Sequence, residues 1–130
     1  MPGCVLRASG ASFDVDAFLK ESSFEPDIIY RKGQRRRPAS RGAQTSSGFN
    51  VVITDNEDPD EQVKRAAKFL RENQKELVRL LKTKGVQSVT VEITSPQKEF
   101  VARTAHLPTA LLSSAGALGI NIDVSFYLVA

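Results

Sequence analysis

Hydrophobic and polar residues alternate along several short segments of the chain, and a period of two is typical of β-strands. The alternation is strongest over 120–129, where Asn121 and Tyr127 belong to the polar set. Four further segments with this pattern predict strands at 5–9, 27–32, 49–54 and 88–94. Because the strands alternate, we expect a sheet with one buried face and one face in water.

A period close to 3.6 residues predicts three helices between these strands. The longest spans 59–84, with Asp58 as its N-cap, acidic residues in its first turn and lysines near its end. A short helix follows the first strand, with Ser12 or Asp14 as its cap. The third spans 108–119, from a proline to a glycine, which are typical residues for the start and end of a helix.

The predicted order of elements is β-α-β-β-α-β-α-β. It favours an α+β fold in which a mostly antiparallel sheet and helices on one face form two layers. The first six elements match a ferredoxin-like βαββαβ unit, and the last two add a C-terminal αβ unit. A doubly wound parallel sheet is the alternative, but its strands read as continuous apolar runs. A length of 130 residues predicts a single domain, 1–130.

Charge is distributed unevenly, although the formal net charge is only +3. Five acidic residues and no basic residue lie within 55–61, where they suit the N-terminus of the long helix. Segment 34–48 has no apolar periodicity and is rich in serine and glycine, so we expect a flexible basic loop there. Six basic residues and no acidic residue lie within 31–42, namely Arg31, Lys32, Arg35, Arg36, Arg37 and Arg41.

Five of these basic residues form a candidate site for phosphate groups or for an acidic partner: Lys32, Arg35, Arg36, Arg37 and Arg41. Arginine offers bidentate hydrogen bonds to either group, and each phosphate contact steepens the salt dependence of nucleic-acid binding. Two other interpretations stay open. Either the loop is simply solvated, or it docks on the acidic run of its own molecule or of a second copy.

Residues that commonly carry catalysis or bind metal are scarce. The chain has one cysteine, Cys4, and one histidine, His106, too few for a zinc site. No Walker A, G-x-G-x-x-G or G-x-S-x-G motif occurs. We therefore predict no catalytic residue, no cofactor and no metal. Cys4 is interpreted as a buried structural thiol and His106 as a surface residue.

The chain also has features of a cytoplasmic protein. A lone cysteine cannot form an intramolecular disulfide, which suits a reducing compartment. The start of the chain lacks the basic region and apolar run of a secretory signal. Segment 107–120 is interrupted by proline and glycine and is too short to span a bilayer, so we expect no membrane partner.

Short motifs are spaced along nearly the whole chain: Gly10, Phe24-x-Pro26, Lys32-Gly33, Pro108, Leu111-Leu112 and Gly119. Their order resembles a bacterial family known only as a domain of unknown function. Members of that family often carry tryptophan near the start of the third strand, where this chain has Phe49. The resemblance implies a compact α+β module that often stands alone, and it supplies no established activity and no catalytic residues.

The polar face of the predicted sheet suits a protein contact. It has one aromatic residue and two acidic residues, a poor surface for stacking bases compared with RNA-binding sheets. Asn121 and Tyr127 are the candidate contacts on it, together with the acidic run. The residues of this face are Arg7, Asn50, Thr90, Glu92, Asn121, Asp123 and Tyr127.

Our first prediction is a non-enzymatic binding module that acts through a protein partner or as a homodimer. If the C-terminal strand lies at an edge of the sheet, its unpaired backbone groups can pair with that partner. The alternative is a nucleic-acid-associated protein that binds phosphates through the basic loop. An enzyme of unrecognised class is the third possibility.

Overall fold

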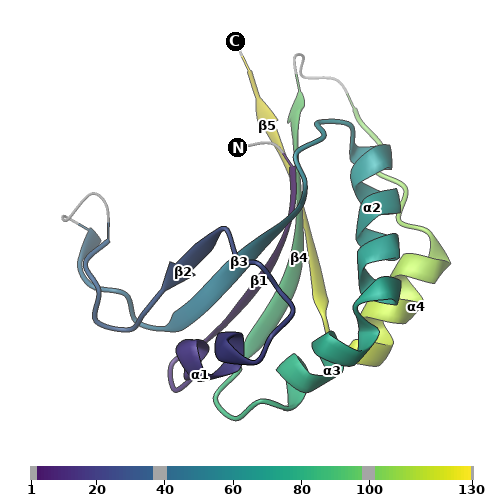
Figure 1. The fold of residues 1–130 in the computed structure, drawn as a ribbon. Coiled ribbons are helices and arrows are strands. Elements are labelled where there is room, and N and C mark those ends of the chain that lie inside the picture. Colours follow the sequence, from purple (N-terminus) through teal and green to yellow (C-terminus); the bar gives the residue numbers. More distant parts are fainter. Residues whose placement is uncertain (1–2, 37–40, 98–101, 130) are drawn as a thin grey trace.

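The computed structural model describes residues 3–36, 41–97 and 102–129, which form one five-stranded sheet with four helices packed on it (Figure 1). The strands are β1 (Gly3–Gly10), β2 (Ile28–Tyr30), β3 (Ser47–Thr54), β4 (Ser88–Gln97) and β5 (Asn121–Leu128). The helices are α1 (Val15–Lys20), α2 (Pro59–Glu72), α3 (Gln74–Lys82) and α4 (Thr109–Leu118).

The strand order across the sheet is β2-β3-β1-β4-β5. Neighbouring strands are antiparallel except β4 and β5, which are parallel and joined through α4. The first four strands therefore have the order of a split βαβ unit, and α4 with β5 extends that sheet by one strand. This confirms the predicted α+β fold with a ferredoxin-like unit and a C-terminal αβ unit.

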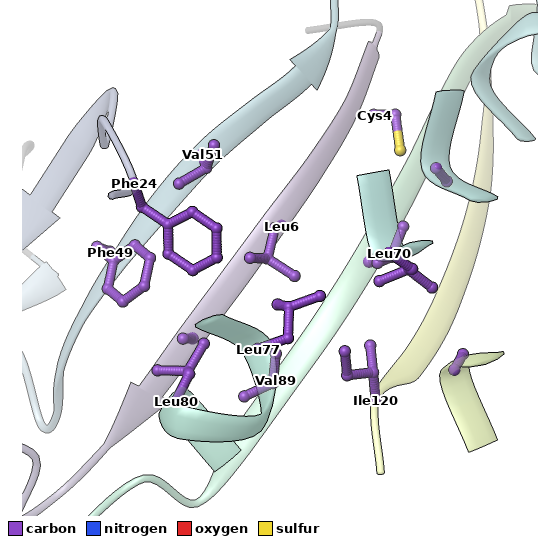
Figure 2. Packing of buried hydrophobic residues seen from close by; sticks show 14 of the residues in the cluster. Cys4, Leu6, Phe24, Phe49, Val51, Leu70, Leu77, Leu80, Val89 and Ile120 are labelled. Atoms are coloured by element: carbon purple, nitrogen blue, oxygen red, sulfur yellow. The ribbon is translucent and has the colours of Figure 1, made fainter. Parts of the chain in front are cut away.

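The apolar residues of the long strands point toward the helices and form the core. Directly paired residues share a face of the sheet, and Leu6 of β1 lies between Val51 of β3 and Val91 of β4. Leu70 of α2 and Leu77 of α3 cover them from the helix layer, and all five side chains are buried (Figure 2). The predicted alternation of the strands thus follows from one face being covered and the other not.

The predicted long helix is in fact two helices, because the helix is interrupted at Asn73 between α2 and α3. The Asn73 side chain Nδ2 donates to the Phe69 carbonyl oxygen at 2.9 Å, and the Asn73 backbone N–H donates to the same oxygen at 3.0 Å. The backbone bond is the ordinary i→i−4 bond of α2, and the side chain adds a second donor to the same carbonyl oxygen. Local side-chain hydrogen bonds of this kind favour asparagine at helix ends. Both helices still bury their apolar stripes, so the prediction was wrong only about continuity.

A hydrogen-bonded cluster around Glu76 ties α3 to the segment that contains α1. The backbone N–H and the hydroxyl of Ser23 donate to Glu76 Oε2 at 3.1 and 3.3 Å, and Arg79 Nε donates to Oε1. The Arg79 guanidinium lies 4.1 Å from the ring centre of Phe18. Burial raises the pKa of Glu76, but the hydrogen bonds from Ser23 and Arg79 outweigh it and hold that pKa below its usual value.

We expect Glu76→Gln to lower the free energy of unfolding at neutral pH by about 1–2 kcal/mol, because it weakens charge-assisted hydrogen bonds. A carboxylate with a lowered folded pKa stabilises the fold above its unfolded pKa, and that stability is lost as the pH falls through the folded pKa. The native protein should therefore lose this contribution below about pH 4.5, and the variant should not. Urea unfolding at neutral and acidic pH measures how the free energy of unfolding of each protein depends on pH. The same pH dependence in the native protein and in Glu76→Gln would contradict this role of Glu76.

Candidate functional site

In the described part of the chain, the helices lie on one side of the sheet and leave the other face open (Figure 1). The character of this open face changes from one edge to the other. Ile28 and Val52, near β2, are 55% and 45% exposed, whereas Glu92 and Asp123 bring acidic groups to β4 and β5. One row of directly paired residues crosses all five strands: Ile28, Asn50, Arg7, Thr90 and Asn121.

The basic loop after β2 folds back on itself as a two-stranded ribbon. The Gln44 N–H donates to the Gln34 carbonyl oxygen at 2.7 Å, and the Arg36 N–H donates to the Gly42 carbonyl oxygen at 3.0 Å. An antiparallel bridge at Arg35 lies between these two pairs. Because side chains alternate along an extended strand, Arg36 and Gln44 lie on one face of the ribbon and Arg35 on the other.

The ribbon separates the basic residues that the sequence groups together. Lys32, Arg35 and Arg41 are exposed, whereas Arg36 is half-buried and lies against the open face of the sheet. Arg37 lies outside the described residues. The predicted cationic site is therefore not one surface, since at least Arg36 belongs to a different environment from its neighbours.

Arg31, the first basic residue of the loop, is paired with an acidic residue of α1. Its Nε and Nη2 donate to the two carboxylate oxygens of Asp16 at 2.8 and 2.6 Å. The hydrogen bond from Arg31 lowers the pKa of Asp16 below its ordinary value. This bidentate pair anchors the base of the ribbon to α1 and neutralises one of its charges locally.

The acidic run lies at the opposite end of β3 from the basic loop. The loop leads into Ser47 and the acidic run follows Thr54, so an eight-residue strand of about 25 Å separates them. Among the described residues, no salt bridge joins the loop to the acidic run of its own molecule. The Asp58 carboxylate instead accepts from the Glu61 N–H at 3.3 Å, which confirms Asp58 as the N-cap of α2.

The ribbon and the open face together line a polar pocket of about 310 Å³ that is open to solvent. Arg7 and Asn50 lie opposite each other on β1 and β3, and Tyr30 reaches in from β2. Tyr30 is paired with Gly48, and a Cβ at Gly48 would lie 2.6 Å from the Tyr30 hydroxyl, so glycine lets the ring approach the sheet. The full lining is Arg7, Tyr30, Arg36, Gln44, Ser46 and Asn50.

Two polar atoms among these lining residues are buried without a hydrogen-bond partner in the described chain, Arg36 Nε and Asn50 Oδ1. Most buried polar atoms in proteins have such a partner. Arg7 is partly neutralised, because its Nη2 lies 3.0 Å from Glu92 Oε2. Arg36 has no carboxylate within salt-bridge distance among the described residues, so the pocket carries a net positive charge.

The two predicted protein contacts, Asn121 and Tyr127, lie on the same face of β5. β5 is an edge strand, since β4 is its one neighbour in the described sheet. Asn121 is exposed and Tyr127 is half-buried. Leu128, at the end of the strand, is 50% exposed. The structure therefore places both candidates at an edge that is eight residues long.

The groups that could carry other chemistry are placed as the sequence predicts. Cys4 is fully buried, and burial raises the pKa of its thiol to about 12, as expected for a structural cysteine. His106 is exposed. Within 3–36, 41–97 and 102–129, no group of three or more His, Cys, Asp or Glu residues could hold a metal ion. No helix of these segments is long and apolar enough to cross a membrane.

Fold and surface together define a small α+β module with one open sheet face, one long sheet edge and a basic ribbon. The model of a family described as "Domain of unknown function (DUF4279)" matches residues 2–129, so the chain belongs to that family. Neither a curated protein nor a solved structure matches the chain.

Sequence reasoning placed Arg7 and Asn50 on the exposed face but did not connect them with the loop. The connection needs the return of the ribbon, which brings Gln44 and Ser46 over β1 and β3. A usable signal was the register of the ribbon, because Arg36 lies opposite Gly42, and Gly42 and Gln44 are two residues apart on one strand and so share a face. That signal is readable only when the pairing of the ribbon is known.

Proposed function

We propose that this protein is a non-catalytic interaction module that associates through the outer edge of β5, first of all with a second copy of itself. The observation that carries the proposal is that β5 itself has none of the usual features that protect a sheet edge. Natural edge strands are usually short, bulged, or interrupted by lysine or proline. β5 has eight residues, no lysine, arginine or proline, and a single charge at Asp123, whereas the other edge, β2, has three residues.

The backbone groups that β5 offers can be assigned from its pairing. The Val129 N–H donates to the Gln97 carbonyl oxygen at 3.0 Å, toward β4. Successive residues of a strand direct their N–H and C=O groups to alternate sides. The N–H and C=O groups of Ile122, Val124 and Phe126 therefore point away from β4 and are available to an added strand.

Side-chain charge selects the register of a symmetric antiparallel pair. A twofold axis at Val124 places Asp123 opposite Ser125 of the second copy and Asn121 opposite Tyr127. In this register no two residues of like charge face each other. A register shifted so that Asp123 faces its own copy would set two carboxylates directly across the interface, which is unfavourable. The proposed dimer is therefore a continuous ten-stranded sheet centred on Val124, with Asn121 and Tyr127 in contact.

One hollow of the surface, between α2, α3 and α4, supports a non-catalytic role. It has a volume of about 600 Å³ and is lined mainly by small or apolar side chains. Arg71 is the one ionisable residue of that lining. Enzyme sites typically bring several ionisable groups with perturbed pKa values into a cleft. This hollow does not have that composition.

Nucleic-acid binding through the basic loop is the alternative proposal. It rests on the exposed residues Lys32, Arg35 and Arg41. We rank it second because Arg31 is paired with Asp16 and Arg36 lies against the sheet, so fewer cations remain to release counterions from phosphates. Salt-sensitive binding of labelled random DNA, lost when the three exposed residues are changed to alanine, would favour this alternative.

Replacing Val124 with proline is the sharpest test of the edge. Proline removes one outward N–H, and at an edge position that faces solvent it leaves the ladder with β4 intact. We expect the native protein to show a mass that rises with concentration in sedimentation velocity and Val124→Pro to associate at least about tenfold more weakly. Val124→Thr keeps the N–H and nearly the same shape, so it should behave like the native protein.

Far-UV circular dichroism establishes that each variant keeps its secondary structure. The proposal fails if the native protein is monomeric at every concentration, or if Val124→Pro associates as strongly as Val124→Thr. Association that survives both changes would assign the contact to a different surface.

A further inference from the structure

We propose that the pocket beneath the basic ribbon binds a small oxyanion that also carries a hydrogen-bond donor, as a hydrogen phosphate or a phosphate monoester does. This site is separate from the β5 edge, because Tyr30 and Arg36 lie at the β2 side of the sheet, with β3, β1 and β4 between β2 and β5. The inference does not depend on self-association.

Charge selects an anion for this pocket. Arg36 contributes a guanidinium with no carboxylate within salt-bridge distance among the described residues, and Arg7 contributes a second one shared with Glu92. Arginine presents parallel N–H donors that match the spacing of phosphate and carboxylate oxygens. An oxyanion here accepts from Arg36 Nε and from the unshared donors of Arg7, and those hydrogen bonds are charge-assisted.

The second buried atom without a partner, Asn50 Oδ1, narrows the chemical class of the ligand further. Asn50 Oδ1 is a buried acceptor, so a ligand that fills the pocket has to bring an O–H or N–H group to it. Hydrogen phosphate at neutral pH has such an O–H, whereas sulfate has only acceptor oxygens. An acceptor oxygen of sulfate placed against Asn50 Oδ1 is repelled by its lone pairs and gains no hydrogen bond there, whereas the O–H of hydrogen phosphate does. The pocket should therefore prefer phosphate over sulfate.

The remaining lining residues fit a small polar ligand. The hydroxyl groups of Tyr30 and Ser46 and the amide of Gln44 can donate or accept, so they adapt to either kind of atom. A volume of about 310 Å³ is at the small end of ligand pockets. The site suits a single anionic group with a short substituent and is too small for a bulky cofactor.

Titration with inorganic phosphate and with sulfate, at constant ionic strength in chloride, tests the site. Calorimetry measures the dissociation constants, and ¹H–¹⁵N spectra of arginine side chains follow the Arg36 Nε–H directly. We expect saturable phosphate binding, weaker sulfate binding, and a shift of the Arg36 Nε–H resonance. Arg36→Gln should weaken phosphate binding by about tenfold or more, because it removes charge-assisted hydrogen bonds.

Arg35→Gln is the matched control, since it removes the same charge from the neighbouring position on the other face of the ribbon. It should change phosphate binding by less than about threefold, the effect expected of screened charge alone. Equal weakening by Arg35→Gln and Arg36→Gln would overturn the proposal in favour of diffuse attraction to the loop. Equal affinity for sulfate and phosphate, or no saturable binding of phosphate, would overturn it as well.

Discussion

Phe49→Ala should lower the free energy of unfolding by about 3–5 kcal/mol, the range found when a fully buried aromatic side chain is truncated. Phe49 is completely buried in β3, and its ring centre lies 5.8 Å from that of Phe18, 6.2 Å from that of Phe24 and 6.3 Å from that of Phe13. Removing the ring leaves a cavity and also breaks three aromatic contacts. A loss of this size is a large fraction of the stability of an ordinary domain.

Urea unfolding followed by far-UV circular dichroism measures the change, since the chain has no tryptophan. Val52→Ala, on the same strand but half-exposed on the open face, should cost less than about 1 kcal/mol. If both variants lose the same amount, the aromatic cluster is not the centre of the core. The Phe49 variant also tests how α1 is held, because Phe18 lies in α1 and Phe13 lies just before it.

Gly10→Ala is expected to be nearly as damaging, at about 3 kcal/mol, although it adds a single methyl group. A Cβ at Gly10 would lie 1.8 Å from the carbonyl oxygen of Gly85, which is backbone and cannot rotate away. The two segments are held together there, because the Gln87 N–H donates to the Ser9 carbonyl oxygen at 2.9 Å. Gly85 is itself closely packed against backbone, because a Cβ there would lie 2.2 Å from the carbonyl oxygen of Ser12, and its φ of +92° favours glycine. It therefore has little room to move away from Gly10.

Gly116→Ala is the matched control for this prediction. Gly116 lies in α4 with open space where its Cβ would be, and alanine is the better helix former by about 1 kcal/mol. We therefore expect the two glycine substitutions to have opposite signs in the same unfolding assay. A Gly10 variant as stable as the native protein would show that the end of β1 and the turn before β4 can separate without cost.

The strands were predictable because each has one face in the core and one in water, so their period is written in the residues. The largest errors concern places where hydrogen bonds compete at short range. Asn73 ends α2 through its own side chain, although the apolar stripe continues from Leu70 to Leu77 without a change of face. The pattern reports burial, and burial continues across that break.

Gln62 is a polar residue to which the hydrophobic pattern of the sequence assigns no place in the core. It is completely buried in α2, where its Nε2 donates to the carbonyl oxygens of Asn56 at 2.7 Å and of Thr94 at 3.0 Å. These bonds tie the start of α2 to β4. Only the packing of the helix on the sheet supplies the acceptors that make this burial favourable.

By itself, the sequence determined the fold class, the alternating faces of the strands, the cap at Asp58 and the burial of Cys4, because each depends on neighbours close in the chain or on hydrophobicity alone. Tertiary structure decided which strand lies at an edge of the sheet and which loop residues lie beside the open face. Arg36 lies beside Arg7 and Asn50 because the strand order and the pairing of the ribbon bring together segments that are far apart in the sequence. Local periodicity cannot encode such contacts, since they depend on the register of separate strands.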